Sequence, residues 1–432
     1  MLAKYAPNSA QVDGNQLSIG GVSCLSLAEK FGTPLYVIDE QTIRDNCRAY
    51  KEAFSAHYAN HEMVFASKAL CTVPTSKIIS SEGFGFDVAS GGELYTVLKA
   101  GADPKNIYFH GNNKPINELK EALDAQINCF VVDNFTELLN LEKLSRQLKK
   151  KANIMLRINP GIEAHTHEYI QTGKLDSKFG LNQDKLLKTI EIIKKAPDLN
   201  LIGLHAHIGS QIFESKPFAE EIKVLLQLVK KLKNDHKVDI QKINVGGGVG
   251  IAYQEEDQPL AVDVLAKFLA KTIYSECKAL SIEEPVLVLE PGRSIVGNAG
   301  VTLYTIGSIK KIPKMKNYIM VDGGMSDNPR PILYQAVYSA LLANRAREKN
   351  RTVYSVAGRF CESGDILIKE IKLPEAASGD ILAMFSTGAY CYSMASNYNR
   401  VTRPAMVIVN KGKSRLAVKR ESYEDLVRND II

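Results

Sequence analysis

The sequence lacks the features that would place the chain in a membrane-spanning, disulfide-stabilised or zinc-binding class. No apolar run reaches the ~18 residues of a membrane span, and the first residues lack the apolar stretch of a signal peptide. The seven cysteines form no Cys-x-x-Cys pair, so neither a metal site nor a disulfide framework is expected. These absences predict a protein of the reducing cytoplasm with no membrane partner.

A strong charge of one sign is also absent. The net charge is +6 over 432 residues, which gives no reason to expect a nucleic-acid partner. The basic run 411–420 alternates with apolar residues, so we interpret it as the solvated face of a strand. Hydrophobic residues make up 45% and charged residues 24%, as in ordinary globular proteins. The length predicts two or three domains of about 150 residues each.

Short apolar runs recur at regular intervals after residue 60, and helical patterns lie between them. Runs of four or five mostly apolar residues are typical of buried parallel strands. Repeated βα units, eight in about 250 residues, predict an α/β fold of the (β/α)8 TIM-barrel type. The predicted strands are 63–66, 85–88, 107–110, 129–132, 154–158, 202–206, 242–245 and 286–290.

A different pattern begins after Arg293 and predicts a second, mainly β domain. Turn residues separate its runs, and a helical pattern is visible only at 331–347. The segment before residue 40 has short strands and a helix at 25–31, and we expect it to pack with this β domain. The predicted strands are 301–312, 317–321, 352–356, 366–371, 381–385, 405–409 and 414–418. The predicted organisation is 1–40, a barrel over 41–292, and a C-terminal β domain over 293–432.

Polar residues follow most of the predicted barrel strands, and catalytic groups of such barrels lie at these strand ends. Lys68 follows the first strand. We expect partial burial there to lower its pKa and free the amine to attack an aldehyde, although a surface lysine is the alternative. Glu290 ends the eighth strand. It is suited to pair with the ring nitrogen of a cofactor, and a salt bridge to Arg293 is the alternative.

The seventh predicted strand leads into the glycine cluster NVGGGVG at 244–250. Glycine lets backbone N–H groups approach and surround a phosphate. Ile251 occupies the place of the last glycine of a dinucleotide fingerprint, and no Gly-Lys-Ser/Thr follows. The cluster therefore predicts a phosphate site typical of barrels, with a tight turn as the alternative.

Two histidines, His205 and His207, end the sixth predicted strand. We expect them to point to opposite sides, so that only one faces the barrel mouth. His207 is suited to stack on an aromatic cofactor ring, and His205 is interpreted as a core histidine with satisfied hydrogen bonds. No metal is expected at this pair, nor at His165 and His167, which lack carboxylates at ligand spacing.

Taken together, these stretches resemble the diaminopimelate decarboxylase family, within the fold-type III pyridoxal-phosphate enzymes. The resemblance covers about residues 30–420, and the HTHEYIQTG loop together with CESGD is its most specific part. The stretches include FASKA around Lys68, DVASGGEL at 87–94, HAHIGSQI at 205–212, LEPGRSIVGNAG at 289–300, VDGGMSDNPRPILY at 321–334, CESGD at 361–365 and SMASNYN at 393–399. The chain departs from the common pattern at Leu70, Arg359 and Cys391.

The resemblance implies pyridoxal 5′-phosphate as the cofactor and decarboxylation of meso-2,6-diaminopimelate to L-lysine as the reaction. Lys68 would form the Schiff base, His207 would stack on the ring, Glu290 would pair with its nitrogen, and Cys361 would donate the proton. The implied cofactor-binding residues are Lys68, His207, Ser210, Gly247, Gly248, Glu290, Gly292, Arg293 and Tyr390. The implied substrate-binding residues are Arg293, Arg330, Tyr334, Glu362 and Tyr390.

The resemblance also implies a homodimer, in which Cys361 and Glu362 reach the active site of the partner subunit, and a lid over 163–178. Related decarboxylases of ornithine, arginine or carboxynorspermidine are the first alternative, but Arg330 and Tyr334 favour a substrate with a second carboxylate. A glutamate at position 290 disfavours an alanine racemase. A non-catalytic regulatory homologue is the remaining alternative, although Lys68 and Cys361 are both present.

Overall fold

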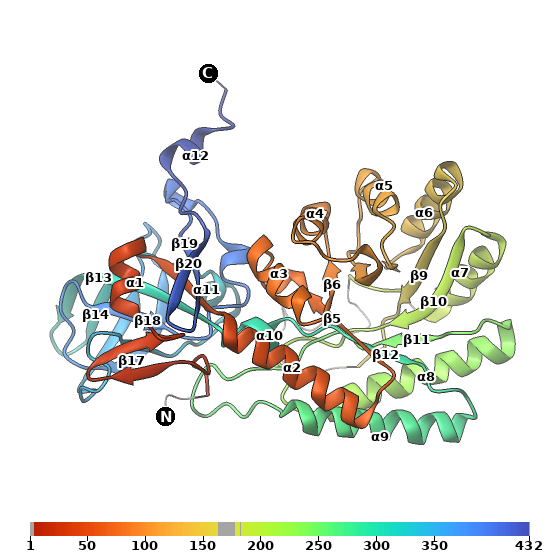
Figure 1. The fold of residues 1–432 in the computed structure, drawn as a ribbon, viewed down its shortest axis with the longest axis horizontal. Coiled ribbons are helices and arrows are strands. Elements are labelled where there is room, and N and C mark those ends of the chain that lie inside the picture. Colours follow the sequence, from red (N-terminus) through yellow and green to blue (C-terminus); the bar gives the residue numbers. More distant parts are fainter. Residues whose placement is uncertain (1–3, 163–177, 182, 432) are drawn as a thin grey trace. The chain divides into compact units, whose positions relative to one another are not determined.

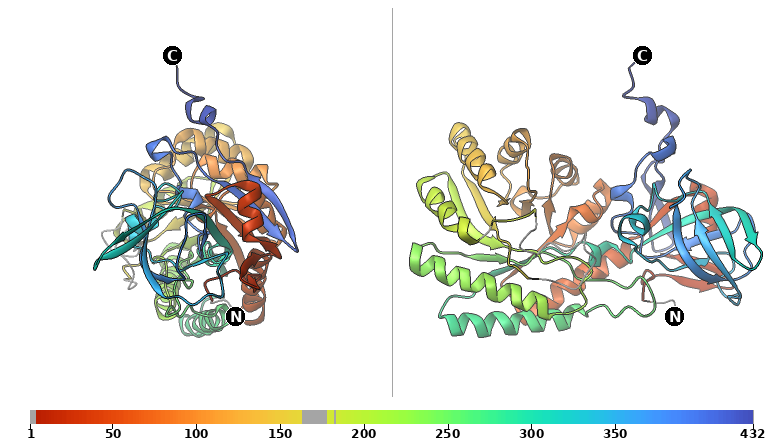
Figure 2. Two further views of the ribbon diagram at one scale, coloured as in Figure 1. Left: turned by 90° about the vertical axis from the view of Figure 1, so that its left-hand side faces the viewer. Right: turned by 180° about the vertical axis from the view of Figure 1, so that it is seen from behind.

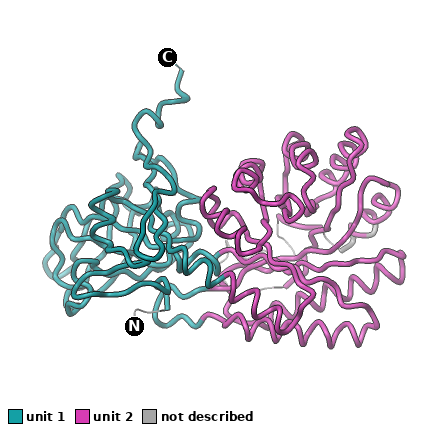
Figure 3. The backbone as a smooth tube through the Cα atoms, viewed as in Figure 1, with its two compact units in different colours: residues 1–46, 251–258, 293–432 teal, residues 47–250, 259–292 magenta. Residues whose placement is uncertain are grey.

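The computed structural model describes residues 4–162, 178–181 and 183–431 (Figure 1), so residues 163–177 of the predicted lid, with both of its histidines, lie outside the described residues. The chain forms two compact units (Figure 3). Unit 1 contains residues 1–46, 251–258 and 293–432, and unit 2 contains 47–250 and 259–292. The short segment 251–258 thus belongs to a different unit from the residues on either side of it.

Unit 2 contains a closed barrel of parallel strands, which confirms the predicted fold class (Figure 1). Each strand pairs with the next in the chain, and β12 pairs with β5 to close the barrel. The strands are short and mostly buried because helices cover their outer side. They are β5 (His61–Ala66), β6 (Gly85–Val88), β7 (Ile107–Phe109), β8 (Cys129–Val132), β9 (Ala152–Arg157), β10 (Leu199–His205), β11 (Lys242–Asn244) and β12 (Val286–Leu289).

Helices surround the strands of the barrel (Figure 2). Several begin within a few residues of a strand end, where a polar side chain caps the helix. The Ser90 side chain accepts a hydrogen bond from the Glu93 amide at the start of α4, and Asn134 does the same for Glu137 at α6. The helices are α2 (Glu40–His57), α3 (Val73–Ser81), α4 (Gly91–Lys99), α5 (Ile116–Ala125), α6 (Phe135–Leu148), α7 (Gln183–Lys195), α8 (Lys216–His236) and α9 (Val262–Leu280).

Unit 1 is mainly β structure, as predicted for the C-terminal part. Its large sheet has the order β17-β16-β14-β13-β4-β19-β20, and β18 pairs with β13 and β15. The N-terminal segment supplies the interior strand β4 (Leu35–Asp39), between β13 and β19, and the helix α1 (Cys24–Phe31). The other strands are β13 (Gly300–Ile312), β14 (Lys316–Val321), β15 (Ala340–Leu342), β16 (Thr352–Ala357), β17 (Ile366–Leu373), β18 (Ile381–Met384), β19 (Ala405–Asn410) and β20 (Lys413–Val418).

The two ends of the chain share one hydrophobic core in unit 1. Leu17 and Leu27 from the N-terminal segment are buried in the same cluster as Val301 and Val407. β4 pairs in parallel with β19, with Val37 opposite Val407. This packing confirms that the N-terminal segment completes the β domain.

The predicted helix over 331–347 is wrong. The structure has a single short helix, α11 (Arg330–Tyr334), followed by the strand β15 (Ala340–Leu342). Gln335 takes a left-handed conformation, with φ +52°, and ends the helix. Pairing of β15 with β18 outweighs the helical pattern of this segment. Among the described helices, none is long and apolar enough to cross a membrane.

Candidate active site

Polar side chains meet where the barrel strands end. β10 lies between β9 and β11, and its last residue, His205, is in register with Arg157 on one side and Asn244 on the other. Glu290 follows the last residue of β12. All four side chains are buried. Parallel strands of equal register therefore bring residues from four βα units to one place.

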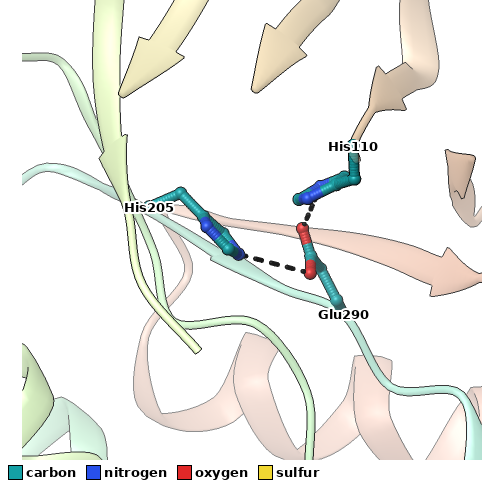
Figure 4. Close-up of side chains that lie close together, drawn as sticks. All are labelled: His110, His205 and Glu290. Atoms are coloured by element: carbon teal, nitrogen blue, oxygen red, sulfur yellow. Dashed lines mark ion pairs between the residues drawn. The ribbon is translucent and has the colours of Figure 1, made fainter. Parts of the chain in front are cut away.

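Glu290 lies between two imidazoles in this cluster (Figure 4). Its Oε1 atom is 2.8 Å from Nε2 of His110, and its Oε2 atom is 3.6 Å from Nε2 of His205. The Asn244 amide donates a hydrogen bond of 2.7 Å to Oε1. Burial by itself would raise the pKa of Glu290, but the contact with His110 opposes burial and this pKa is held well below its ordinary value. The carboxylate is therefore kept ionised inside the barrel.

His205 does not have the role that we expected from the sequence. It is buried, but neither ring nitrogen has a hydrogen-bond partner among the described residues. Burial lowers the pKa of His205 to about 3, so the ring is neutral. The expectation that His205 and His207 face opposite sides is also wrong, because residues i and i+2 of an extended chain point the same way. Burial, Lys68 and Arg157 together lower the pKa of His207, which lies beside the same cluster.

Lys68 lies in η1 (Ser67–Ala69), directly after β5, and its side chain is exposed. The partial burial that the sequence predicts for Lys68 is therefore not seen in this structure. Two carboxyl groups lie in its electrostatic surroundings. Burial raises the pKa of Asp87, and it raises the pKa of Glu93 to about 7, while Lys68 acts against both shifts. The lysine is thus accessible to an aldehyde and close to the polar strand ends.

The glycine cluster after β11 leaves no room for side chains. A Cβ atom on Gly247 would come within 2.1 Å of the Glu290 carbonyl oxygen, and one on Gly248 within 2.3 Å of the Gly209 carbonyl oxygen. Gly248 also has φ +113°, a conformation that side chains disfavour. The Ile212 amide donates to the Gly248 carbonyl at 2.9 Å. The segment that carries Ser210 therefore lies beside the glycine cluster.

A second group of predicted residues lies in unit 1. Arg293 and Arg330 are buried, and Nη1 of each donates to the Tyr253 hydroxyl, at 2.6 and 2.9 Å. The Arg293 guanidinium also lies 4.8 Å from the centre of the Tyr390 ring. Tyr390 has φ +60°, a strained backbone conformation of the kind found at functional sites. Unit 1 thus brings Arg293, Arg330 and Tyr390 together.

The remaining predicted residues of unit 1 lie nearer the surface. Cys361 and Glu362 are exposed, and Tyr334 is half-buried at the end of α11. The Cys361 amide donates to the Asn399 side chain at 3.0 Å. Among the described residues, no hydrogen bond joins Cys361 or Glu362 to Arg330. The two residues are therefore available to a neighbouring molecule.

Comparisons with known proteins identify the family of this chain. Residues 40–297 match the family model described as pyridoxal-dependent decarboxylase, pyridoxal binding domain. The chain is 45% identical to the diaminopimelate decarboxylase of Bacillus subtilis, across 98% of this chain and 97% of that protein. It is 44% identical to the Staphylococcus aureus diaminopimelate decarboxylase, across the full length of both. The chain belongs to the diaminopimelate decarboxylase family.

Solved structures of this family have the same fold as the chain. The diaminopimelate decarboxylase of M. jannaschii superposes with a TM-score of 0.93 at 36% identity, covering 98% of each chain, and its co-complex with L-lysine gives the same values. The Helicobacter pylori enzyme complexed with L-lysine has a TM-score of 0.86 at 33% identity, covering 94% of this chain and 98% of that one. The predicted family is therefore confirmed.

Membership of this decarboxylase family implies pyridoxal 5′-phosphate, and the residues present fit that cofactor. The backbone at Gly247 and Gly248 has no room for side chains. Such a glycine backbone suits a bound phosphate. A carboxylate held ionised at Glu290 suits a protonated ring nitrogen. The exposed amine of Lys68 suits a covalent link to the aldehyde.

The sequence places His110 and Asn244 at predicted strand ends but gives them no role, and it does not single out Tyr253. His110 and Asn244 both contact Glu290, and Tyr253 contacts two predicted arginines. His110 and Asn244 occupy strand ends, so the position in the barrel unit was a sufficient indication. Tyr253 had no such indication, because it lies beyond the glycine cluster in a segment that leaves the barrel.

Proposed function

We propose that this protein decarboxylates meso-2,6-diaminopimelate to L-lysine and CO2 with the help of pyridoxal 5′-phosphate. The buried, ionised carboxylate of Glu290 is the observation that carries the reaction type. The substrate is supported by the relatives of 44% and 45% identity, which are diaminopimelate decarboxylases. A racemase would be expected to place an arginine, and not a carboxylate, at the ring nitrogen.

In this proposal the barrel, 41–292, holds the cofactor, which supplies an electron sink for the carbanion left by the loss of CO2. Lys68 would bind the aldehyde, His207 would lie against the ring, and Glu290 would keep a proton at the ring nitrogen. Backbone groups of Gly247 and Gly248, with Ser210, would hold the phosphate. Gly292, Arg293 and Tyr390 would complete this set of cofactor contacts.

The β domain, 293–432 with 1–40, would bind the far end of the substrate. Arg330 is buried, and among the described residues its hydrogen bonds go to tyrosine hydroxyls and not to a carboxylate. A buried guanidinium without a carboxylate suits an anionic ligand. Arg293, Arg330, Tyr334 and Tyr390 would hold the substrate's second carboxylate, which ornithine and arginine lack.

We propose that the active enzyme is a homodimer with shared sites. Cys361 and Glu362 are exposed in the protomer, and so are the apolar side chains of Ile332, Leu333 and Val337 in the same unit. Exposed apolar groups of this kind favour contact with another protein surface. Cys361 would return the proton to the carbanion of the partner's substrate, and Glu362 would select its amine. All seven cysteines are free thiols, which suits a cytoplasmic enzyme.

The test is release of CO2 and lysine from meso-diaminopimelate by purified protein with added cofactor. Ornithine and arginine are run alongside, and so are the variants Lys68→Ala and Lys77→Ala. Lys77 is an exposed lysine of α3, so its loss should leave activity intact. We expect lysine from diaminopimelate alone, and none with Lys68→Ala.

Each other outcome identifies the part of the proposal that fails. Turnover of ornithine or arginine in place of diaminopimelate would keep the cofactor and overturn the roles of Arg330, Tyr334 and Glu362. A Lys68→Ala protein that kept a borohydride-reducible absorption band would overturn the role of the lysine. Bound cofactor with no turnover of any of the three substrates would favour carboxynorspermidine as substrate, or a regulatory protein.

A further inference from the structure

Tyr253 joins two buried arginines in unit 1. Its hydroxyl oxygen accepts from Nη1 of Arg293 at 2.6 Å and from Nη1 of Arg330 at 2.9 Å. The ring is itself buried, 6% exposed, and packs edge-on against Tyr338 with 5.2 Å between ring centres. A phenol oxygen has two lone pairs, so one tyrosine can hold both guanidinium groups at a fixed spacing.

Arg330 is oriented by two tyrosines, whose ring centres lie 5.0 Å (Tyr253) and 5.6 Å (Tyr338) from its guanidinium carbon. Its Nη1 atom donates to Tyr253 and also to the Tyr338 hydroxyl, at 2.9 and 2.5 Å. These two bonds use both Nη1 hydrogens, and the Nε and Nη2 groups have no hydrogen-bond acceptor among the described residues. This Nε–Nη2 edge can bind a carboxylate through two parallel hydrogen bonds. The tyrosines therefore occupy one nitrogen of the arginine and leave its carboxylate-binding edge available.

The segment 251–258 holds the Tyr253 backbone firmly in place. The Asp257 carboxylate accepts from the Tyr253 and Gln254 amides, at 2.8 and 3.0 Å. The Ser339 hydroxyl donates to the Tyr253 carbonyl at 2.8 Å, and the Ser386 hydroxyl donates to the Ala252 carbonyl at 3.0 Å. These hydrogen bonds hold the backbone at three consecutive residues, 252–254. A side chain on such a fixed backbone is well suited to hold other side chains in a defined position.

We propose that Tyr253 is a positioning residue that sets the orientation of Arg330, and its spacing from Arg293, for the carboxylate at the unreacting end of the substrate. This inference rests on the proposed function, since it deepens the account of substrate selection. Tyr253 acts through the arginines, so its loss should weaken recognition of the carboxylate and leave the reacting end unaffected. The preferred ligands are amino acids whose far end carries a carboxylate, over amines of the same length without one.

The test compares Tyr253→Phe with the wild-type protein, both loaded with cofactor. Phenylalanine keeps the ring and its packing and removes only the bridging oxygen. L-Lysine and cadaverine are the probes, because they differ by one carboxylate. We expect Tyr253→Phe to weaken lysine binding and to raise the KM for diaminopimelate by about tenfold to a hundredfold, the loss of hydrogen bonds to charged groups. The affinity for cadaverine and kcat should stay within about twofold of the wild-type values. The melting temperature should stay within about a few degrees of that of the wild type.

Two controls separate this role from a general structural effect. Tyr338→Phe removes one hydroxyl from Arg330 but leaves the bridge between the arginines, so it should change the lysine-to-cadaverine ratio by less. Tyr318→Phe alters a half-buried tyrosine on β14 of the same unit and should change nothing. The inference would be overturned if Tyr253→Phe left the ratio of lysine affinity to cadaverine affinity unchanged. A larger change of this ratio in Tyr338→Phe than in Tyr253→Phe would overturn it as well. Equilibrium binding gives this answer even if diaminopimelate is not turned over, so failure of the proposed function would be seen separately.

Discussion

Nε2 of His110 lies 2.8 Å from Oε1 of Glu290, and both side chains are buried inside the barrel. The two residues come from different βα units, after β7 and β12. The contact keeps Glu290 ionised, although burial alone would favour its neutral form. In the proposed reaction this charge is what keeps the proton on the cofactor ring.

We therefore expect the substitution His110→Phe to raise the pKa of Glu290. It removes the imidazole that contributes most to lowering this pKa against the effect of burial. As pH falls, Glu290 should then become protonated at a higher pH than in the wild type. The acid limb of the kcat/KM profile should move upward, and activity at neutral pH should fall by about tenfold. The control is His236→Phe, at the end of α8. An unchanged acid limb would contradict the role of His110.

Glu221 of α8 is fully buried, and neither carboxyl oxygen has a hydrogen-bond partner among the described residues. Burial raises its pKa well above the ordinary 4.5. The folded state therefore binds this proton more tightly than the unfolded state, and stability is lost as pH rises above 4.5. Glu221→Met should stabilise the protein by about 1–3 kcal/mol at neutral pH and by less at pH 4.5.

Denaturant unfolding at both pH values measures this difference. The matched control is Glu220→Met, the exposed neighbour on the same helix, which should change the free energy of unfolding by at most about 0.5 kcal/mol. A destabilised Glu221→Met protein would show that the carboxyl group has a partner or a function that the structure does not explain.

Lys114 and Glu137 form a buried ion pair beside the barrel, with Nζ 2.6 Å from Oε1. Lys114 also donates to the carbonyl groups of Gly111 and Val131. Lys114→Met should cost about 3–5 kcal/mol, because it leaves the Glu137 carboxyl buried without its cation. The double variant with Glu137→Met should recover part of that loss.

Unfolding curves of the two single variants and the double variant give the coupling energy directly. Lys150→Met serves as a control, because it removes a surface pair with Asp124 of 2.7 Å that should contribute about 0–1 kcal/mol. Additive effects of Lys114→Met and Glu137→Met would show that the two charges do not depend on each other.

Shared active sites predict recovery of activity when two inactive variants are mixed. Lys68→Ala and Cys361→Ala subunits form a mixed dimer with one intact site, so random exchange should restore about a quarter of wild-type activity. Activity is measured after mixing, and subunit exchange is confirmed with tagged chains. Exchange without recovery would mean that Lys68 and Cys361 of one chain serve the same site.

The local sequence pattern was sufficient to predict the barrel strands. The runs 85–88 and 129–132 coincide with β6 and β8, because a strand buried on both sides must be apolar along its length. The local pattern is misleading at 331–347. The apolar residues there have helical spacing, and no local feature of the sequence indicates the strand β15. Pairing with β18 decides that segment, and a partner strand some forty residues away leaves no mark on local spacing.

The pattern of residues along the chain is enough to predict the fold class, the family, and the residue types that meet at the strand ends. The neighbours of those residues depend on how distant segments of the chain pack. The strand pattern predicts a core residue at His205, and in the structure this residue lies 3.6 Å from Glu290. No local pattern marks Tyr253, which in the structure joins Arg293 and Arg330. Spacing along the chain reports contacts within one helix or strand, whereas barrel closure and the placement of segment 251–258 bring together residues that are far apart in sequence.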